Sequence, residues 1–527
     1  MVAIRREPLR KHPAASGCNR QRAIVALALA LLLALPTIAD PATLTVLQTT
    51  DIHGYVEEGD EPPGAGGWLR VAAALRAERA AAGAQNTLLI DCGDTVAGAF
   101  VAAQSRGRIA VELLRAAEYD VWIPGNHELD YGVRRLREFC AALSDRVLCG
   151  NLVLQPHNDA PYTPRAWRVF ERAGCRVVVI GANSAFLENW LWGADRGDFA
   201  VEPAVAMLAR ILPDVHAQHP DVIVLAAHQG WYPPDRDARS VNEIADIADR
   251  FPEIDLILGG HTHREMPGRR LNATTWYVQG GAHANGYARI QLTVDTERQR
   301  VTDIASRFVV VGDGPRDEKC MRAVASLLDD ARAAEDRTVG TATSAISAYG
   351  RAGFGCATAE LICRAIAESA DADVVIQGKH SQYSLAPGPV TERDLFGLIP
   401  YENGLGVAML TAAELRAILA EQRRLKDAYV YCGVWGARLR WLEDGGVSEV
   451  AVGTEGTVGS DGQRRYRTAF NSYTLAGGGG RFPVLRRITR RPAAQLTECE
   501  VNSREALRRY IQAHSPLQVM PVEWIQR

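Results

Sequence analysis

The chain has 527 residues, of which 47% are hydrophobic and 23% are charged, and its formal net charge at pH 7 is −3. This length exceeds what one hydrophobic core usually serves, so we expect at least two domains of ordinary globular composition. A slightly acidic chain is a poor candidate for binding a nucleic-acid polymer, because tracking that backbone requires stripes of Lys and Arg.

The N-terminus has the pattern of a secretory signal peptide. Basic residues between Arg5 and Arg22 precede a 13-residue apolar run, Ala23 to Leu35, which is followed by the small-residue site Thr37-Ile38-Ala39. The run is too short to span a bilayer, which takes about 20 residues. We therefore expect residues 1–39 to be cleaved near Ala39, giving a periplasmic or secreted protein with no stable membrane insertion. An uncleaved membrane anchor is the alternative.

The following segment, about residues 40 to 312, alternates short apolar runs with amphipathic stretches. The apolar runs predict buried strands at 44–48, 87–90, 121–124, 222–226, 256–258 and 276–279. The amphipathic stretches predict helices at 67–82, 103–117, 131–141, 200–212 and 241–250. This alternation is typical of an α/β sandwich.

Clusters of metal-binding residue types follow five of these strands. They are Asp51-Ile52-His53, Gly93-Asp94, Gly125-Asn126-His127-Glu128, His228 and Gly260-His261-Thr262-His263. Open α/β sheets place their sites at the C-terminal ends of strands, so the clusters are predicted to converge. Two Asp, one Asn and four His supply oxygen and imidazole donors without a thiolate, which suits Zn, Mn, Fe or Co. Such a set can hold two ions if one carboxylate bridges them.

Each cluster taken alone has a plainer interpretation. An Asp-x-His sequence is often a turn, and His228 after a strand can be a hydrogen-bonded core histidine. All five clusters together favour a metal site, because a partly buried group of carboxylates and imidazoles without a cation would leave polar atoms unsatisfied.

The order of the clusters resembles that of the calcineurin-like metallophosphatases, and the version from Gly125 to Asp130 is similar to their 5'-nucleotidase branch. The resemblance implies an N-terminal αββα metallophosphatase sandwich with two divalent ions. One ion would be held by Asp51, His53, Asp94 and His263, and the other by Asp94, Asn126, His228 and His261, with Asp94 as the bridge. His127, paired with Asp130, would be a catalytic histidine that does not bind metal.

Two further segments complete the predicted organisation. Residues 313–337 are charged and Ala-rich without a strand signal, which predicts a linker helix. Residues 338–527 resemble the family's C-terminal substrate domain, of α+β class, in the segments 387–415 and 471–483. In that family, aromatic residues of these segments sandwich a nucleobase, and the resemblance implies Tyr401 and Tyr473 in that role.

One segment departs from the 5'-nucleotidase pattern. That branch has Asn-Gly-Gly-Gly-Ile-Arg where this chain has Gln377-Gly378-Lys379-His380-Ser381-Gln382. The Arg that grips a phosphate or carboxylate is absent, and Lys or His does not reproduce its two-pronged geometry. Arg351 or Arg481 could compensate. The segment 471–483 is closer to the 2',3'-cyclic-nucleotide phosphodiesterases of the same superfamily.

The resemblance therefore implies an exported hydrolase that cleaves phosphoesters of nucleotides by attack of metal-bound hydroxide. A 5'-nucleotidase and a 2',3'-cyclic-nucleotide phosphodiesterase are both retained as hypotheses. Hydrolysis on a sulfur carrier and non-catalytic nucleotide binding are remote alternatives. The metal, the base preference and the oligomeric state are not predicted.

Two smaller features remain open. Nine cysteines follow the predicted cleavage site without a CxxC sequence. In an exported protein some of them could pair, the odd count leaves at least one free thiol, and the sequence does not indicate which residues would pair. Cys92 is interpreted as a core residue. His283, which follows the strand predicted at 276–279, either touches substrate or caps a turn.

Overall fold

The structure is a computed structural model. It describes residues 41–59, 66–155, 162–192, 198–232, 242–350, 355–378, 380–401, 403–424, 433–441, 447–453 and 463–526. The predicted signal peptide, residues 1–39, lies outside the described residues, as do Arg351, Lys379 and Cys432. Ala42–Arg527 form a single compact unit.

A first sheet carries the first three of the predicted metal-binding clusters. Its strand order is β13-β12-β1-β2-β3, with bounds β1 Ala42–Thr49, β2 Thr87–Asp91, β3 Val121–Trp122, β12 Gly286–Asp295 and β13 Arg300–Val310. β1, β2 and β3 pair in parallel, whereas β12 and β13 extend the sheet as an antiparallel hairpin. The parallel strands therefore end at one edge.

A second sheet carries the later clusters. Its strand order is β10-β11-β9-β8-β6-β5, with bounds β5 Trp167–Arg172, β6 Cys175–Asn183, β8 Val222–His228, β9 Leu256–Gly259, β10 Glu265–Arg270 and β11 Trp276–Gly280. β6, β8, β9 and β11 are parallel, and the outer strands β5 and β10 are antiparallel to their neighbours.

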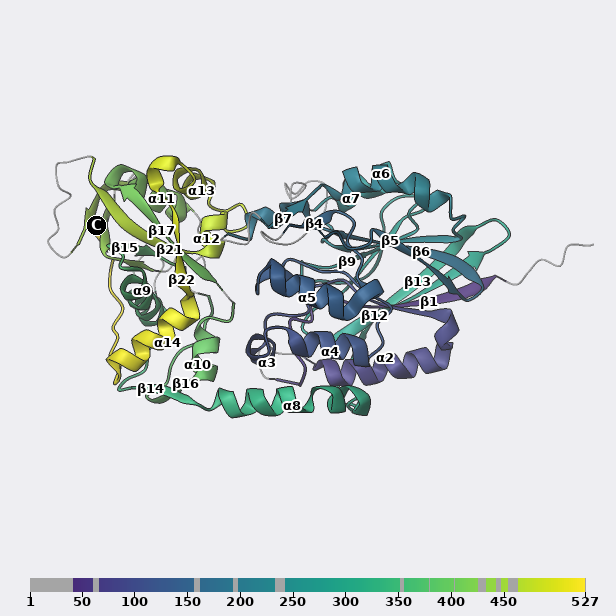
Figure 1. Cartoon of the computed structure of the whole chain (residues 1–527), viewed down its shortest axis with the longest axis horizontal. Helices are drawn as coiled ribbons and strands as arrows, with labels where there is room; N and C mark the ends of the chain where they lie inside the picture. The colour runs from purple at the N-terminus through teal and green to yellow at the C-terminus, as the bar shows by residue number, and fades with distance from the viewer. Residues whose placement is uncertain are drawn as a thin grey trace, which may run out of the picture. The chain divides into compact units, whose positions relative to one another are not determined.

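The two sheets face each other between layers of helices (Figure 1). Alternating residues of a strand contact different layers. Leu44 and Val46 of β1 join Val177 and Val179 of β6 in the core between the sheets. Leu47 points the opposite way, toward the helices α2 (Trp68–Ala82), α4 (Arg108–Ala116) and α5 (Val133–Leu143). Helices α6 (Ala204–His216) and α7 (Ile244–Arg250) cover the second sheet. Each sheet therefore has one face toward the other sheet and one face toward helices, because successive residues of a strand point to opposite sides. This arrangement confirms the predicted αββα sandwich.

A third sheet forms the centre of the C-terminal part. Its order is β18-β15-β21-β17-β22, with bounds β15 Val374–Ile376, β17 Gly404–Thr411, β18 Val434–Trp435, β21 Arg465–Asn471 and β22 Thr497–Asn502. One face packs on α9 (Ala357–Ala370), α10 (Glu392–Leu398) and α14 (Ser503–His514), and the other on α11 (Ala412–Arg424) and α13 (Pro483–Thr489). The mixed sheet with helices on both faces confirms the predicted α+β class.

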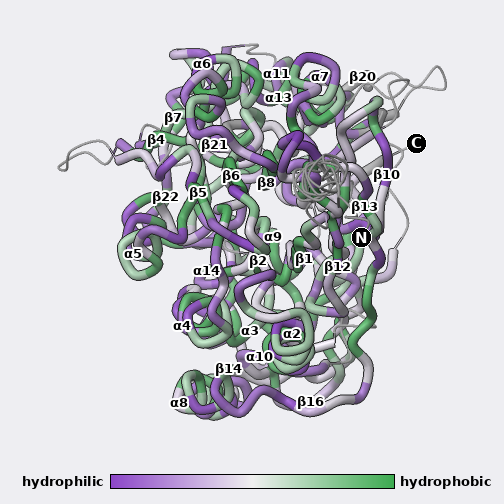
Figure 2. Tube along the Cα trace, turned by 90° about the vertical axis from the view of Figure 1, so that its right-hand side faces the viewer, coloured by the Kyte–Doolittle hydropathy of each residue, from purple (hydrophilic) through white to green (hydrophobic). Residues whose placement is uncertain are grey.

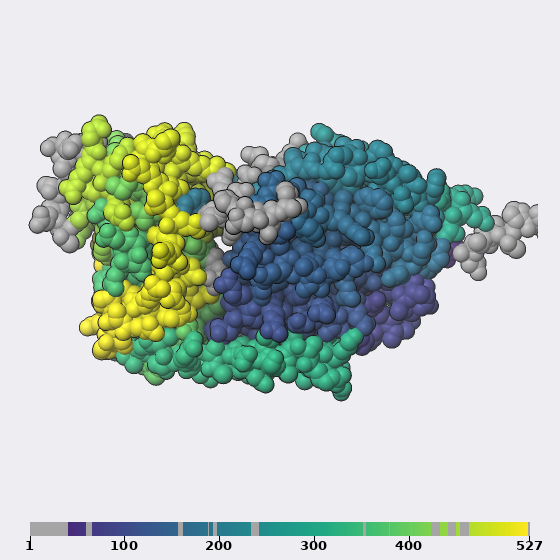
Figure 3. Space-filling model, viewed as in Figure 1, coloured from purple at the N-terminus to yellow at the C-terminus, as the bar shows by residue number. Residues whose placement is uncertain are grey.

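Helix α8 (Glu318–Glu335) follows the two stacked sheets in sequence and precedes the C-terminal part. It packs on the helices that cover the first sheet. Its buried residues Cys320, Val324 and Leu328 join the core that contains α2 and α4. Its remaining residues are mostly exposed, so hydrophobic and hydrophilic positions alternate along its tube in Figure 2 and its outer face is visible in Figure 3. Asp317 caps the helix by accepting a hydrogen bond from the backbone N–H of Cys320.

Short elements complete the fold. They are the strand pairs β4 (Leu152–Leu154) with β7 (Phe199–Val201) and β14 (Thr338–Ala342) with β16 (Gly388–Thr391), the strands β19 (Ala437–Trp441), β20 (Val447–Val452) and β23 (Ile525–Gln526), and the helices α3 (Phe100–Gln104) and α12 (Ser472–Ala476). Among the described residues, no helix is long and apolar enough to cross a membrane. The eight cysteines in the described ranges are free, and Cys92 is buried as expected.

Candidate metal centre

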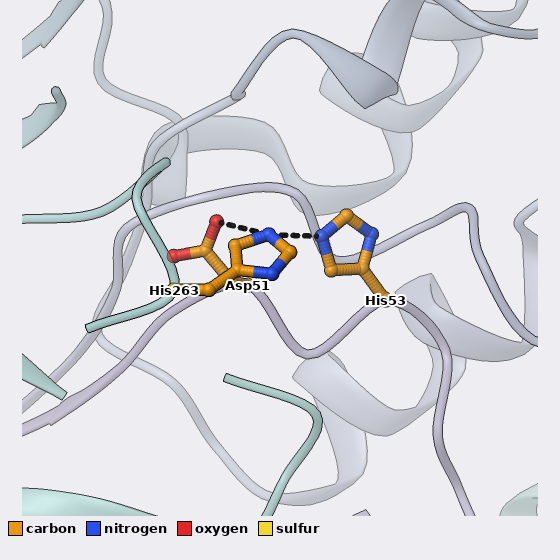
Figure 4. A group of neighbouring side chains, drawn as sticks. All are labelled: Asp51, His53 and His263. Atoms are coloured by element: carbon orange, nitrogen blue, oxygen red, sulfur yellow. Dashed lines mark hydrogen bonds and ion pairs between the residues drawn. The ribbon is translucent and has the colours of Figure 1, made fainter. Parts of the chain in front are cut away.

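The first group of donors comprises Asp51, His53 and His263, whose ligand atoms lie within 4.8 Å of one another (Figure 4). His53 Nε2 lies 3.0 Å from His263 Nε2, and His263 Nε2 lies 3.5 Å from Asp51 Oδ1. The Nδ1–H of His53 is positioned to donate to the carbonyl of Ala97 at 2.8 Å, which directs its Nε2 toward the other two side chains.

The second group comprises Asp94, His228 and His261, with Asn126 between the two histidines. His228 Nε2 lies 3.1 Å from Asp94 Oδ2 and 3.2 Å from Asn126 Oδ1. His261 Nδ1 lies 2.9 Å from the same amide oxygen. On the far side of the ring, His228 Nδ1 lies 2.7 Å from the carbonyl oxygen of Cys92, so the ring orientation is fixed by the backbone.

Asp94 connects the two groups. Its Oδ2 atom lies 3.1 Å from His228 Nε2 and 4.0 Å from His53 Nε2, and its Oδ1 accepts a hydrogen bond from the backbone N–H of His127 at 2.8 Å. One carboxylate thus faces donors that come from strands of both sheets. All seven predicted ligands lie in this one cluster.

The backbone at the cluster adopts an uncommon conformation. Positive φ angles, from +51° to +73°, occur at Asp51, His53, Asp94, His261, His263 and the neighbouring His283. Left-handed backbone is unfavourable for residues with a Cβ and collects at functional sites, where the surrounding structure imposes it. These turns follow directly on buried strands, and they aim successive side chains into the same space.

A buried carboxylate holds the loops of the cluster together. Glu128 is fully buried and accepts hydrogen bonds from the backbone N–H groups of Asp94, Thr95, Val96 and Gly125. A Cβ at Gly125 would lie 2.7 Å from the backbone nitrogen of Asp94, so only glycine allows this approach. Glu128 stood in one of the predicted clusters, but its part in positioning the loops was missed.

The protonation states of the first group suit a cation. Burial lowers the pKa of His53 well below its usual value and that of His263 to about 4, so both rings are neutral and can offer a lone pair. Burial lowers the pKa of His261 to about 3 as well. Asp51 and Asp94 are 0% and 1% exposed. Burial at His228 is outweighed by the charge of Asp94, which raises the pKa of that ring to about 9, so a cation at this place would displace its proton. Two buried carboxylates beside the neutral rings of His53, His261 and His263 form a donor set that divalent cations fit.

His127 lies at the edge of the cluster and outside both donor groups. Its Nδ1 is 2.8 Å from Asp130 Oδ2, and its ring stacks on that of Tyr401 with centroids 5.4 Å apart and an interplanar angle of 22°. Burial opposes protonation, but the charges of Asp130 and Asp94 outweigh it and raise the pKa of His127 to about 10. The structure thus pairs His127 with Asp130.

His283 lies against the first donor group. Its ring centroid is 5.0 Å from that of His263, 5.7 Å from that of His53 and 5.0 Å from that of Tyr55. Its backbone N–H donates to the carbonyl of Asp51 at 2.8 Å. The sequence predicted that the strand at 276–279 leads back near the predicted metal ligands, and His283 lies there.

A cavity of about 840 Å³ adjoins the cluster. Its walls include Asn126, His127, Asp130 and His261 from the N-terminal part and His380, Tyr401, Asn471, Tyr473 and Arg481 from the C-terminal part. Tyr401 and Tyr473 therefore border the same cavity as Asn126 and His261, two of the seven predicted ligands. Arg481 donates to the hydroxyl of Tyr473 at 3.3 Å. His380 lies beside Gln377 and Asn471, and burial lowers its pKa to about 4.

The class of the protein follows from two family models. Residues 44–265 match the calcineurin-like phosphoesterases, and residues 338–487 match the C-terminal domain of 5'-nucleotidases. The predicted family is confirmed: the chain is a calcineurin-like phosphoesterase that carries a 5'-nucleotidase C-terminal domain, a family of metal-dependent hydrolases.

Curated relatives are similar over different lengths. A 2',3'-cyclic-nucleotide 2'-phosphodiesterase/3'-nucleotidase of Haemophilus influenzae is 24% identical over 43% of this chain, which spans only 37% of that protein. Protein UshA of Yersinia enterocolitica is 24% identical over 90% of this chain and 92% of its own length. A 5'-nucleotidase precursor of Thermus thermophilus shares the fold with a TM-score of 0.67 at 21% identity, over 92% of this chain and 99% of that one.

Proposed function

We propose that the chain is an exported phosphoester hydrolase that holds two divalent cations and releases phosphate from nucleotides. The observation that carries the proposal is the position of Asp94 between two donor groups, of which Asn126 and His261 line a cavity whose walls also include Tyr401 and Tyr473. A phosphoryl group and a nucleobase would then bind at separate places in the same cavity.

In this proposal each donor group holds one cation. Asp51, His53 and His263 hold the first, and Asn126, His228 and His261 hold the second, with Asp94 shared. When bound, a pair of divalent cations lowers the pKa of water and neutralises phosphoryl charge. The carbonyls of Ala97 and Cys92 fix the imidazoles of His53 and His228 in the orientation that this requires.

His127 acts on the phosphoryl group as a proton carrier. Asp130 accepts from its Nδ1–H, and the charge of Asp130 raises the pKa of the ring, which favours the protonated form with its Nε2–H available to donate. An imidazolium at the edge of the cluster stabilises negative charge on the phosphoryl oxygens and can protonate the leaving oxygen. Tyr401 stacks on the ring and limits its rotation.

Cleavage of 2',3'-cyclic nucleotides is the second candidate. Three of the relatives are named 2',3'-cyclic-nucleotide 2'-phosphodiesterase/3'-nucleotidase. The neutral Gln382 also favours cleavage of cyclic nucleotides. A cyclic monophosphate carries one negative charge, so the absence of an Arg weakens its binding less than it weakens the binding of a 5'-monophosphate dianion. Hydrolysis on a sulfur carrier rests on fold alone, since the structure named sulfate thiohydrolase SoxB is 18% identical with a TM-score of 0.61.

A substrate panel on purified protein tests the proposal. We expect hydrolysis of 5'-AMP and of 2',3'-cyclic AMP, with about two divalent cations per chain in elemental analysis. Strict preference for 5'-monophosphates would exclude the cyclic candidate. Binding of nucleotides by fully metal-loaded protein with no turnover of any phosphoester would instead identify a non-catalytic relative.

Export rests on the N-terminal sequence pattern. The basic residues, the apolar run and the small residues before Asp40 are those of a cleaved signal peptide. N-terminal sequencing of the protein from the cell envelope or medium should begin near Asp40. A start at the first residues would contradict cleavage.

A further inference from the structure

A segment between β6 and β7 brings an indole ring to the metal-binding residues. β6 ends at Asn183, and the side chain of Ser184 accepts a hydrogen bond from the N–H of Phe186, which begins a short 3-10 helix at Ala185–Asn189. The ring of Phe186 then meets that of Trp190 edge-on at 5.2 Å. This contact between two residues of the same loop therefore orients the ring of Trp190.

Trp190 lies beside the second donor group. Its ring centroid is 4.6 Å from that of His261, with an interplanar angle of 44°. Both residues border the cavity that also contains Asn126 and His127. An atom bonded to a phosphoryl group at the cluster would consequently come close to the indole.

The Nε1 side of the indole approaches the C-terminal part at Gly479. Gly479 has φ +66°, and a Cβ built there would lie 3.1 Å from Trp190 Nε1 and 3.3 Å from the hydroxyl of Tyr473. Glycine thus leaves Trp190 and Tyr473 close together on the same wall. Trp190 spans the distance between the donor group and one of the two tyrosines.

The loop is held on both sides of Trp190. Arg486 donates a hydrogen bond to the side chain of Asn189. Leu191 packs against the core of α2 and α4, and Trp192 packs against the core of α11 and α13. A ring held in this way is pre-organised, so little conformational entropy is lost when a ligand packs against it.

We propose that Trp190 is a third substrate-contacting aromatic residue, and that it packs against the sugar that carries the phosphate. The inference rests on the proposed function, because it takes the phosphate to bind at the donor groups. Tyr401 and Tyr473 then contact the base, which is farther from the phosphorus atom. The indole supplies a large, rigid, apolar face at a low cost in side-chain entropy.

Three ligands separate the parts of the nucleotide. 5'-AMP contains base, sugar and phosphate, ribose 5-phosphate lacks the base, and inorganic phosphate, measured as an inhibitor, lacks both. For Trp190→Leu we expect KM to rise roughly 3- to 10-fold for 5'-AMP and for ribose 5-phosphate alike. The inhibition constant of phosphate and the metal content should not change. Trp190→Phe, which keeps an aromatic face, should recover most of the loss.

Two control variants define the result. Tyr473→Ala should raise KM for 5'-AMP but not for ribose 5-phosphate, since Tyr473 contacts the base. Trp167→Leu removes a half-buried indole from β5 and should change neither KM. A proportional change in phosphate inhibition or in metal content for Trp190→Leu would mean that Trp190 acts through His261 and would overturn the proposal. Unchanged KM values for both substrates would also overturn it.

Failure of the proposed function has a different outcome. In that case the unmodified, metal-loaded protein hydrolyses neither 5'-AMP nor ribose 5-phosphate, and the inference falls with it. If the unmodified protein hydrolyses both and Trp190→Leu behaves identically, only the role of Trp190 is wrong.

Discussion

His53 and His263 are 210 residues apart in sequence, and their Nε2 atoms lie 3.0 Å from each other. One ring follows the first strand of one sheet and the other follows a strand of the facing sheet. The contact exists only because the two sheets are stacked with their parallel strands ending at the same edge. The same contact therefore depends on the stacking of the sheets and brings together two side chains that could bind one cation.

The shared position of Asp94 predicts the effect of its replacement. Asp94→Asn should lose metal and nearly all activity, because the amide supplies no negative charge to either cation. The fold should persist, since an amide oxygen can still accept from the backbone N–H of His127. Elemental analysis, turnover and circular dichroism measure the three effects. Two cations per chain with near-normal turnover would refute the assignment, and the exposed Asp303→Asn serves as control.

His127 lies outside both donor groups, which predicts a separation of metal binding from catalysis. His127→Ala should keep both cations and lower kcat by roughly 10²- to 10⁴-fold, the usual contribution of a positioned acid or charge stabiliser. Asp130→Asn should cause a smaller loss, because the ring remains but its partner is uncharged. Loss of one cation in the His127 variant would make this histidine a ligand instead.

Glu128 predicts a defect in stability as well as in activity. Glu128→Gln replaces an acceptor-only carboxylate by an amide whose N–H₂ faces backbone donors, so at least two of the four N–H groups lose their partner. Each buried, unsatisfied donor costs about 1 to 3 kcal/mol, and we expect a loss of at least about 2 kcal/mol in denaturant unfolding. Unchanged stability with normal metal content would contradict this positioning role.

The two tyrosines predict a dependence on the organic part of the substrate. Tyr401→Ala or Tyr473→Ala should weaken nucleotide binding by about 1 to 3 kcal/mol, the usual range for base stacking. Hydrolysis of a small aryl phosphate should change little for Tyr473→Ala, because the donor groups alone bind its phosphate. Equal losses on both substrates would exclude base stacking. Tyr401 also stacks on His127, so its variant should lower kcat slightly.

Removal of metal should affect folding as well as turnover. Chelation leaves Asp51 and Asp94 buried without a cation, and ligands that bind only the native state stabilise it by mass action. We expect a lower Tm for chelated protein and recovery of Tm and activity when Mn, Co or Zn is returned. An unchanged Tm after verified metal removal would show that the cluster is stable without cations.

Local patterns in the sequence were sufficient for most of the site. Short apolar runs ending in Asp, Asn and His predicted where β1, β2, β3, β8 and β9 end, and the clusters at these ends meet in the structure. Such a prediction works because parallel strands share an edge, so sequence order translates into spatial convergence.

Other features depend on approaches between distant segments. The hairpin of β12 and β13 adds antiparallel strands after the last cluster, and its register with β1 comes from sheet packing rather than from local periodicity. Trp190 reaches the cluster through a loop in which Phe186 contacts the indole. A single sequence carries no periodic signal for such contacts.

The left-handed backbone at the cluster lowers the stability of the fold, while the side chains at the same positions are needed for activity. At Asp51, His53, Asp94, His261 and His263, glycine would relieve the unfavourable φ angle while it removes the donor. A laboratory selection for heat resistance of the metal-free protein would therefore favour glycine at these positions and yield more stable, inactive proteins. The same five positions would resist glycine under a selection for turnover, so the two experiments would drive this part of the chain in opposite directions.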